Sequence, residues 1–440
     1  MVLYLYKVCK MYTEYRILRR SVYNMRKLLK RKLSVLIVAL TILVTSIYSQ
    51  TPAEISAASQ YIKVDAFIKQ LVVSMKVKVN TKSKTPYIDA AISAGILKKG
   101  QFKKYTSFIA RGDAAVLLNR ADEYLYGDKV DPKLVKVILE KRISDIKKIS
   151  SSKREAVAKC FAKGIFTGIS NGYYIQNRSF KGKSYLTITD ASAAIKLLMN
   201  SKSRAKVSPD GMLIKTTNLP KNADKFKYIL ACYPNKFYER PFEFMLYENW
   251  ETRSKDKFAF PVDMNNWTYR NWYNSWSFSK EMDKYLYDWA DLAEQYLNYV
   301  FNVDYRTVND KWINGLGSLY TKSNLNEAEE IKTYYIGKMK ENKVIVESSI
   351  IAVEPSILYY DGNYCMRAYV KYRITAKDIT VKQSKLIYTQ YPYLDNLKNG
   401  VWREGIFDIR FGTNDGSNGD GSDFTIDSLS RFVDSLFITN

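Results

Sequence analysis

The chain has no histidine among its 440 residues, and this absence decides which side chains could carry out catalysis. It excludes a Ser-His-Asp triad, a Cys-His dyad, an HExxH zinc site and a histidine proton shuttle. Paired carboxylates, lysine and tyrosine remain available for acid–base chemistry. The acidic groups at residues 327–330 and at Asp291 and Glu294 are interpreted as solvated helix faces, because acid–base catalysis needs two carboxylates positioned in a cleft. The sequence therefore predicts no catalytic site.

Two other segments have compositions that could bind a ligand. Four tryptophans lie within residues 250–276. Aromatic rings stack on sugars, but we favour a tryptophan-anchored core packed on the helix that follows. Residues 412–423 are rich in Asp, Asn and Gly, as calcium-binding loops are. Because Asp415, Ser417 and Gly419 do not follow the ligand order of an EF-hand, we interpret this segment as a flexible loop. The sequence indicates no metal site and no cofactor.

An apolar segment at residues 33–49 follows a basic run at residues 25–32 and precedes small residues at 56–58. This order is typical of a secretory signal peptide. We therefore expect residues 1–58 to be a cleaved leader, and Met25 to be the true start of translation, since the basic region is otherwise too long. A retained membrane anchor is the alternative, although the apolar stretch is shorter than the ~20 residues that span a bilayer.

The formal net charge of +25 does not come from the leader alone, because residues 1–58 hold ten basic and two acidic residues and leave the rest at about +17. A basic chain favours a polyanionic partner. Export argues against nucleic acid and leaves a cell-wall polymer or a lipid surface. Of the cysteines after the leader, Cys160 is predicted to be a small buried apolar residue, and a bridge between Cys232 and Cys365 stays open.

The sequence predicts an α+β, multidomain chain. Residues 59–204 are expected to form an all-α module, because apolar residues recur three and four apart at 64–76, 87–97, 111–125, 132–147, 151–166 and 189–199. Residues 205–440 are expected to form an α+β domain with antiparallel strands. Its helices are predicted at 279–302 and 326–340, its strands at 344–353, 364–375 and 386–390, and a hairpin turn at 359–364.

An internal repeat relates residues 87–118 to residues 143–195. In each copy a helix ends near a glycine, Gly95 or Gly164, which we expect to serve the helix end. A glycine-containing loop follows, and a polar segment then opens a second helix. At that opening, residues 112–113 and 189–190 place a bare backbone or a side-chain oxygen near the free N–H groups of the helix.

This pattern resembles the S-layer homology (SLH) domain of bacterial surface proteins. Ser144 and Asp145 match the aromatic-Ser-Asp opening of that family. Residues 109–113 match its Ile-Thr-Arg-Ala-Glu helix start with the Arg kept, whereas residues 186–190 keep the Thr and an acid but lack the Arg. Residues 62–67 give a third, partial match. The resemblance covers about residues 60–200.

The resemblance implies helical packing with pseudo-threefold symmetry, in which grooves between repeats hold an anionic secondary cell-wall polymer, often pyruvylated. An Arg would offer a planar fork to acidic groups, and an Asp would orient the Arg or accept sugar hydroxyls. The polymer-binding candidates that it implies are Arg111, Asp113, Asp145, Asp190 and Asp89, with Asp65 a weaker one. The alternatives are that Asp113 and Asp190 only cap helices, that Arg111 is a solvated cation, and that Asp145 only caps the turn before Ser151.

We therefore predict a secreted, non-enzymatic surface protein of a Gram-positive-type bacterium, anchored to a secondary cell-wall polysaccharide or a peptidoglycan-linked polymer. Nucleic acid is not an expected partner, and the oligomeric state stays open. One alternative is a wall hydrolase with two carboxylates about 5–9.5 Å apart within residues 205–440. The other is a structural protein whose repeats no longer bind polymer, in which Arg111 would form an internal salt bridge.

Overall fold

The computed structural model describes residues 60–239, 276–320, 327–360, 364–388, 397–413 and 424–426. The chain divides into two units, Met1–Ile62 and Lys63–Asn440, and the elements below belong to the second unit. The predicted leader, the tryptophan-rich segment up to residue 275 and residues 414–423 lie outside the described residues. Among the described helices, none is both long enough and apolar enough to span a membrane.

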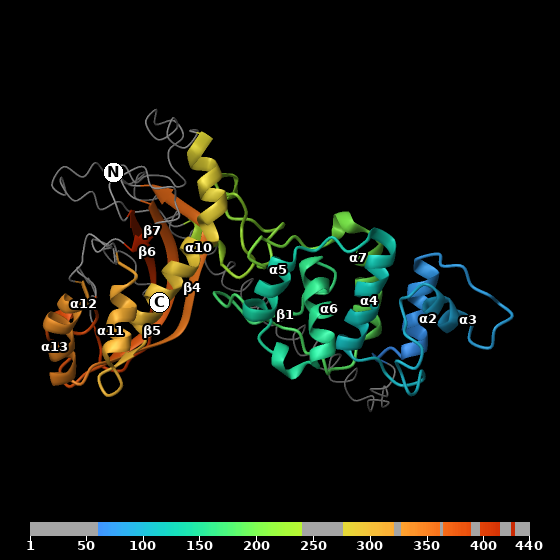
Figure 1. Ribbon diagram of the computed structural model, residues 1–440, viewed down its shortest axis with the longest axis horizontal. Helices are drawn as coiled ribbons and strands as arrows, with labels where there is room; N and C mark the ends of the chain where they lie inside the picture. Colours follow the sequence, from blue (N-terminus) through green and yellow to red (C-terminus); the bar gives the residue numbers. More distant parts are fainter. Residues whose placement is uncertain are drawn as a thin grey trace, which may run out of the picture. The chain divides into compact units, whose positions relative to one another are not determined.

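Six α-helices lie within the described residues before residue 205 (Figure 1). Most of them bury an apolar face, whereas the shortest buries only Val135. Five of the six predicted helices are confirmed to within four residues at each end, and the one predicted at 132–147 is shorter. Polar groups begin two of them, since Asp131 accepts the N–H of Lys133 and Thr187 accepts the N–H of Asp190. The helices are α2 (Val64–Ser74), α3 (Pro86–Ser93), α4 (Arg111–Tyr126), α5 (Pro132–Val137), α6 (Ser151–Ala162) and α7 (Ile188–Met199).

The helix predicted over residues 132–147 is interrupted. After α5 the chain continues as a π-helical turn, η2 (Ile138–Arg142), and then leaves the helix at Ile143. The cause lies far along the sequence, because Ile143 forms a β-bridge with Arg178. A short 3-10 turn, η3 (Ile146–Lys148), then leads to α6.

The segment before residue 205 is mainly helical rather than all-α, which corrects the prediction in this detail. Strands β1 (Ile169–Ser170) and β2 (Arg178–Ser179) pair antiparallel in the glycine-containing loop. Gly168 has a positive φ, and a Cβ at this position would lie 2.8 Å from the carbonyl oxygen of Ser179. Only glycine therefore allows the two strands to approach here without distortion.

The predicted glycine roles at the helix ends are confirmed. Gly95 follows α3 and Gly164 follows α6, and both have positive φ. The chain reverses there because the N–H of Gly164 donates to the carbonyl of Phe161 and the next N–H donates to the carbonyl of Cys160.

The second half contains a five-stranded antiparallel sheet and several helices, so the α+β class is confirmed. The sheet order is β3-β4-β5-β6-β7. Its strands are β3 (Val303–Asp304), β4 (Ile345–Tyr360), β5 (Tyr364–Thr375), β6 (Arg403–Thr413) and β7 (Phe424–Ile426). The helical elements are α8 (Asn235–Glu239), α10 (Trp276–Phe301), α11 (Asp310–Gly317), α12 (Glu327–Glu330), the π-helical η6 (Ile331–Ile336) and α13 (Gly337–Glu341).

The two faces of this sheet are covered by different parts of the chain. On one face α10 lies along the sheet and packs Trp289, Tyr296 and Phe301 into the main core (Figure 1). On the other face residues 212–238 bury a second apolar cluster that includes Tyr369 and Ile406. The sheet therefore alternates residues between two cores, as its period of two requires.

The hairpin between β4 and β5 is confirmed by the pairing of Tyr360 with Tyr364, while its turn residues 361–363 lie outside the described residues. The strand predicted at 386–390 is wrong where the structure describes it. Leu386 and Ile387 follow a 3-10 turn, η7 (Gln383–Lys385), and are buried in the main core without joining the sheet. Their apolar character reflects burial rather than strand pairing.

Candidate functional site

Arg111 begins α4 and lies inside the protein, with 8% of its surface exposed. Its Nε donates to the carbonyl of Phe180 at 3.1 Å, and its Nη1 lies 2.9 Å from Oδ2 of Asp190. The guanidinium also lies over the ring of Phe166, at 4.3 Å from its centroid. Burial lowers the pKa of Arg111, and the nearby carboxylates of Asp190 and Asp145 oppose this effect. The structure thus brings together two predicted site residues, Arg111 and Asp190, from corresponding helix starts.

Asp145 holds a loop of the second repeat copy against the turn that precedes α6. Its two carboxylate oxygens accept the backbone N–H groups of Phe180 and Lys181, each at 2.7 Å. Lys181 has a positive φ, which this pair of hydrogen bonds stabilises. The amides that Asp145 binds lie 35 and 36 residues along the chain, not in the turn before Ser151.

The same loop also contacts the start of α4. The N–H groups of Arg111 and Gly112 donate to the carbonyls of Ser184 and Gly182, each at 2.9 Å. A Cβ at Gly112 would lie 3.1 Å from the Gly182 oxygen, so this approach needs a small residue. The loop at residues 180–184 is therefore the element that gathers the predicted site residues.

The remaining candidates occupy different surroundings. Asp113 forms an ion pair with Lys153 at 2.7 Å, and both side chains are partly exposed. Asp190 stands in the first turn of α7, with 49% of its side chain exposed. Asp89 accepts the hydroxyls of Ser83 and Thr85 and so serves the start of α3. Asp65 accepts the N–H of the residue after it. Polymer binding by each of these residues stays a prediction.

Comparison with known families supports the resemblance that the repeat indicated. Residues 142–178 match the family model of the S-layer homology domain. The chain carries an SLH domain. The matched segment includes the turn at Asp145, helix α6 and the glycine-containing loop with β1, and it ends at Arg178, the first residue of β2. No curated protein matches the chain. An SLH domain indicates association with the cell surface and a cell-wall polymer as the partner.

Four exposed lysines, which we call the basic patch, lie within or just after this SLH segment: Lys147, Lys148, Lys181 and Lys183. They come from the turn after Asp145 and from the loop that Asp145 holds. In the sequence these lysines contribute to the net charge but do not form one group. The sequence shows two lysine pairs, Lys147 with Lys148 and Lys181 with Lys183, on either side of the glycine-containing loop. No local pattern shows that the fold brings the two pairs together.

The glycine-containing loop of the SLH domain also contacts the sheet of the second half. Tyr174 stacks on Tyr369 of β5 with ring centroids 3.6 Å apart and planes within 4°. Gln176 donates to the carbonyl of Val353 in β4 at 2.7 Å and to the hydroxyl of Tyr233 at 2.9 Å. Tyr174 has a positive φ, a strained conformation for tyrosine that these contacts fix in place.

The acidic helix faces predicted in the second half are confirmed in part, because Glu329 and Glu330 are exposed. Asp291 is exposed, as predicted, and pairs with Lys141 at 2.6 Å. Glu327 is only 3% exposed and accepts the hydroxyl of Tyr388, so its prediction as a solvated residue is wrong. Glu294 is half-buried, which likewise corrects the prediction. Burial raises the pKa of both Glu327 and Glu294.

A further carboxyl that sequence analysis did not single out lies in β4. Glu354 is fully buried where the pairing of β4 with β5 shifts register. It accepts the hydroxyl of Tyr238 and the N–H of Ser356, the latter at 2.8 Å. Burial raises the pKa of Glu354 to about 8. The hydrogen bonds from Tyr238 and Ser356 favour the charged form, but burial outweighs them, so the folded protein favours the protonated carboxyl.

None of the cysteines that the structure describes forms a disulfide. Cys160 is fully buried, which confirms its prediction as a small apolar residue, and burial raises the pKa of its thiol to about 12. Cys232 and Cys365 do not form the bridge that the sequence left open.

Proposed function

We propose that the chain is a secreted surface protein that is held non-covalently to an anionic secondary cell-wall polymer through residues 59–204. The observation that carries this proposal is the SLH domain at residues 142–178. The high net positive charge of the chain supports an acidic ligand, because a basic surface attracts polyanions.

In this proposal the predicted site residues divide into two groups by exposure. Arg111 and Asp145 fix the loop at residues 180–184 from its buried side, through their hydrogen bonds to the backbone of Phe180 and Lys181. Asp190, whose side chain is half-exposed, and the partly exposed pair of Asp113 and Lys153 are accessible to sugar hydroxyls. Individual contacts at an exposed surface are weak, and a repeating polymer strengthens them by avidity.

The leader, the Gram-positive-type wall and the non-catalytic role belong to the same proposal. A signal peptide at residues 1–58 would export the chain to the surface where such polymers occur. Amino-terminal sequencing of the protein recovered from the wall fraction tests this step: a start near residue 59 is expected, and a retained residue 33–49 segment would contradict cleavage.

A second candidate function has a specific observation in its favour. Arg111 forms an internal ion pair with Asp190, as expected for a structural protein whose repeats no longer bind polymer. In that case the SLH segment would serve only as a packing unit for the second half, which it contacts through Tyr174 and Gln176.

A sedimentation assay separates the two candidates. The full chain is mixed with peptidoglycan sacculi that carry native wall polymer and with sacculi stripped of polymer by acid. Anchoring predicts binding to native sacculi that is lost on stripped ones. Equal binding to both, fading uniformly with added salt, would mean non-specific charge attraction and would favour the structural role.

A further inference from the structure

We propose that the basic patch, Lys147, Lys148, Lys181 and Lys183, is the surface that binds the acidic groups repeated along the wall polymer. This inference rests on the proposed function and adds to it the residues that face the polymer and the chemistry that they recognise. The expected ligand is a polysaccharide that carries closely spaced carboxylate or phosphate groups. None of the four lysines was implied by the family resemblance.

The two lysine pairs are held together by the fold, although 33 residues separate Lys148 from Lys181 in the sequence. Asp145 binds the amides of residues 180 and 181 and also accepts, through its backbone carbonyl, the N–H of Lys148 at 2.9 Å. Gly182 packs on Ile149, where a Cβ would lie 2.8 Å from the Ile149 side chain. The backbone that carries the four lysines is therefore fixed before any ligand arrives.

The basic patch has no acidic partner within the part of the chain that the structure describes. All four lysines are exposed, and none of them forms an ion pair there. The nearby acids are already engaged: Asp145 by two amides, Asp113 by Lys153 and Asp190 by Arg111. The positive charge of the patch is therefore not neutralised by its surroundings.

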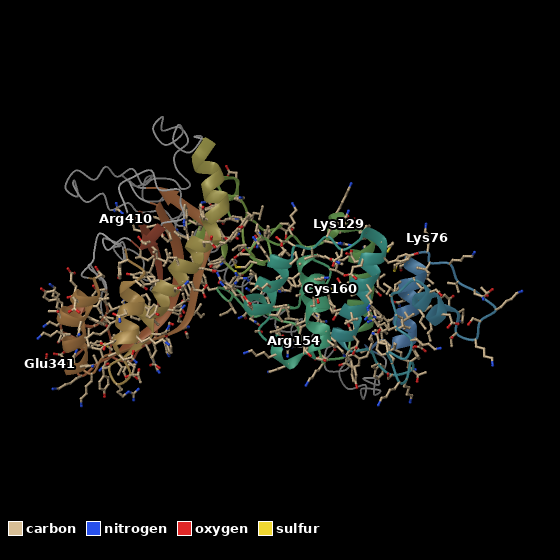
Figure 2. All side chains as sticks on the ribbon, viewed as in Figure 1. Lys76, Lys129, Arg154, Cys160, Glu341 and Arg410 are labelled. Carbon is tan, nitrogen blue, oxygen red and sulfur yellow. The ribbon has the colours of Figure 1, made fainter. Side chains whose placement is uncertain are left out.

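A further cation adds to this excess. Arg154, labelled in Figure 2, donates to the carbonyls of Lys147 at 3.1 Å and Ile149 at 2.9 Å. These acceptors are neutral, so Arg154 keeps its full charge beneath the patch. By contrast Lys159 and Lys163, on the same helix or just after it, each pair with a carboxylate. Like charges on a fixed backbone repel one another, and a bound polyanion relieves that repulsion.

Two variants of the full chain that remove the same charge test the assignment. The patch variant carries Lys147→Gln, Lys148→Gln, Lys181→Gln and Lys183→Gln. The control variant carries Lys311→Gln, Lys332→Gln, Lys340→Gln and Lys398→Gln, which are exposed lysines outside residues 59–204. Each exposed ion pair contributes only a fraction of a kcal/mol, but four of them together exceed the ~1.4 kcal/mol that corresponds to a factor of ten in affinity. The affinity of the patch variant for native sacculi should therefore be at least about tenfold lower than that of the wild type. The control variant should bind like the wild type.

A charge-retaining variant with Arg at the four patch positions distinguishes lost charge from lost folding. It should bind native sacculi as well as the wild type, with an unchanged far-ultraviolet circular dichroism spectrum. Two soluble competitors identify the acid: polyphosphate should displace the wild type if the polymer groups are phosphates, and polygalacturonate if they are carboxylates.

The outcomes separate this inference from the function on which it rests. Equal loss of binding in the patch and control variants would overturn the assignment in favour of diffuse charge. Polymer-specific binding that survives in the patch variant would overturn it too, and would leave the anchoring function standing. Wild-type protein that binds native and stripped sacculi equally would overturn both.

Discussion

Replacing Arg111 by alanine tests whether this residue positions the loop at residues 180–184 or touches the polymer itself. The side chain is 9% exposed and contacts the carbonyl of Phe180, the carboxylate of Asp190 and the ring of Phe166. A side chain so placed has little surface left for a ligand. We therefore expect Arg111→Ala to act first on stability.

The size of the effect follows from those three contacts. Removing the guanidinium leaves the Phe180 carbonyl without this donor, which costs about 1–3 kcal/mol for a buried acceptor. The lost contact with the Phe166 ring adds about 0.5–1 kcal/mol. The ion pair contributes about 1 kcal/mol or less, because solvent screens the half-exposed Asp190. The free energy of unfolding should fall by roughly 2–4 kcal/mol.

Asp190→Asn is the matched control, since it removes only the ion pair. It should lower the free energy of unfolding by about 1 kcal/mol or less. Arg111→Lys keeps the charge but loses the planar fork that reaches both the carbonyl and the carboxylate, so its loss should lie between the two.

Urea unfolding followed by two signals measures these changes. All 7 tryptophans lie at residue 250 or later, so tryptophan fluorescence reports on the second half of the chain. Far-ultraviolet circular dichroism also reports on α2 to α7. Arg111→Ala should shift the circular dichroism midpoint more than the fluorescence midpoint. An unchanged midpoint combined with lost binding to native sacculi would make Arg111 a polymer contact and refute the reasoning.

Two further predictions concern the glycines that follow helices α3 and α6 and the buried carboxyl of Glu354. Gly95→Ala should cost about 1–2 kcal/mol from its positive φ alone, whereas Gly164→Ala should cost far more, because its Cβ would lie 1.9 Å from the carbonyl oxygen of Ala205. Thermal unfolding of both variants checks this, and equal losses would contradict it. Since burial raises the pKa of Glu354 from 4.5 to about 8, the folded protein holds this proton more tightly than the unfolded chain, and stability should fall as pH rises between these values. Glu354→Gln should flatten that decline in urea unfolding, and a decline that persists in the variant would exclude Glu354 as its source.

Most of the helices before residue 205 could be predicted from local pattern, because they bury apolar residues whose spacing is visible in the sequence. α4 is an example: Ala114, Leu117, Leu118 and Ala121 recur at threes and fours and are all fully buried. The break after α5 could not be predicted, since it depends on the bridge between Ile143 and Arg178. Pairing between distant residues leaves no trace in a local window.

The strand β6 was missed for a related reason. Its charged residues interrupt the apolar run, but two of them pair with cations on the neighbouring strand: Asp408 with Arg367 at 2.9 Å and Glu404 with Lys371 at 2.9 Å. Arg367 is fully buried in this arrangement. A charged residue in a covered strand becomes understandable only once the partner and the register are known.

In the candidate site, too, local features could be predicted from the sequence whereas contacts between distant residues could not. The repeat placed Arg111 and Asp190 near corresponding helix starts, and this is why the sequence could select them. It could not show that the two residues meet each other, nor that Asp145 reaches the loop of residues 180–184. The basic patch depends on that second contact, so a count of lysines along the chain could not define it.

The contacts of the SLH domain also limit where a polymer can bind. One stretch of its glycine-containing loop is occupied, because Tyr174 stacks on Tyr369 and Gln176 donates to Val353 of the sheet. In the loop at residues 180–184, the buried face is occupied by Arg111 and Asp145, which bind the backbone of Phe180. The surface that remains available to a polymer is the exposed side of the loop at residues 180–184 and of the turn after Asp145, and this side carries the four lysines. The packing that removes Arg111 from solvent is thus the same packing that fixes the basic patch at the surface, and this is why a buried arginine and a wall-binding domain are compatible.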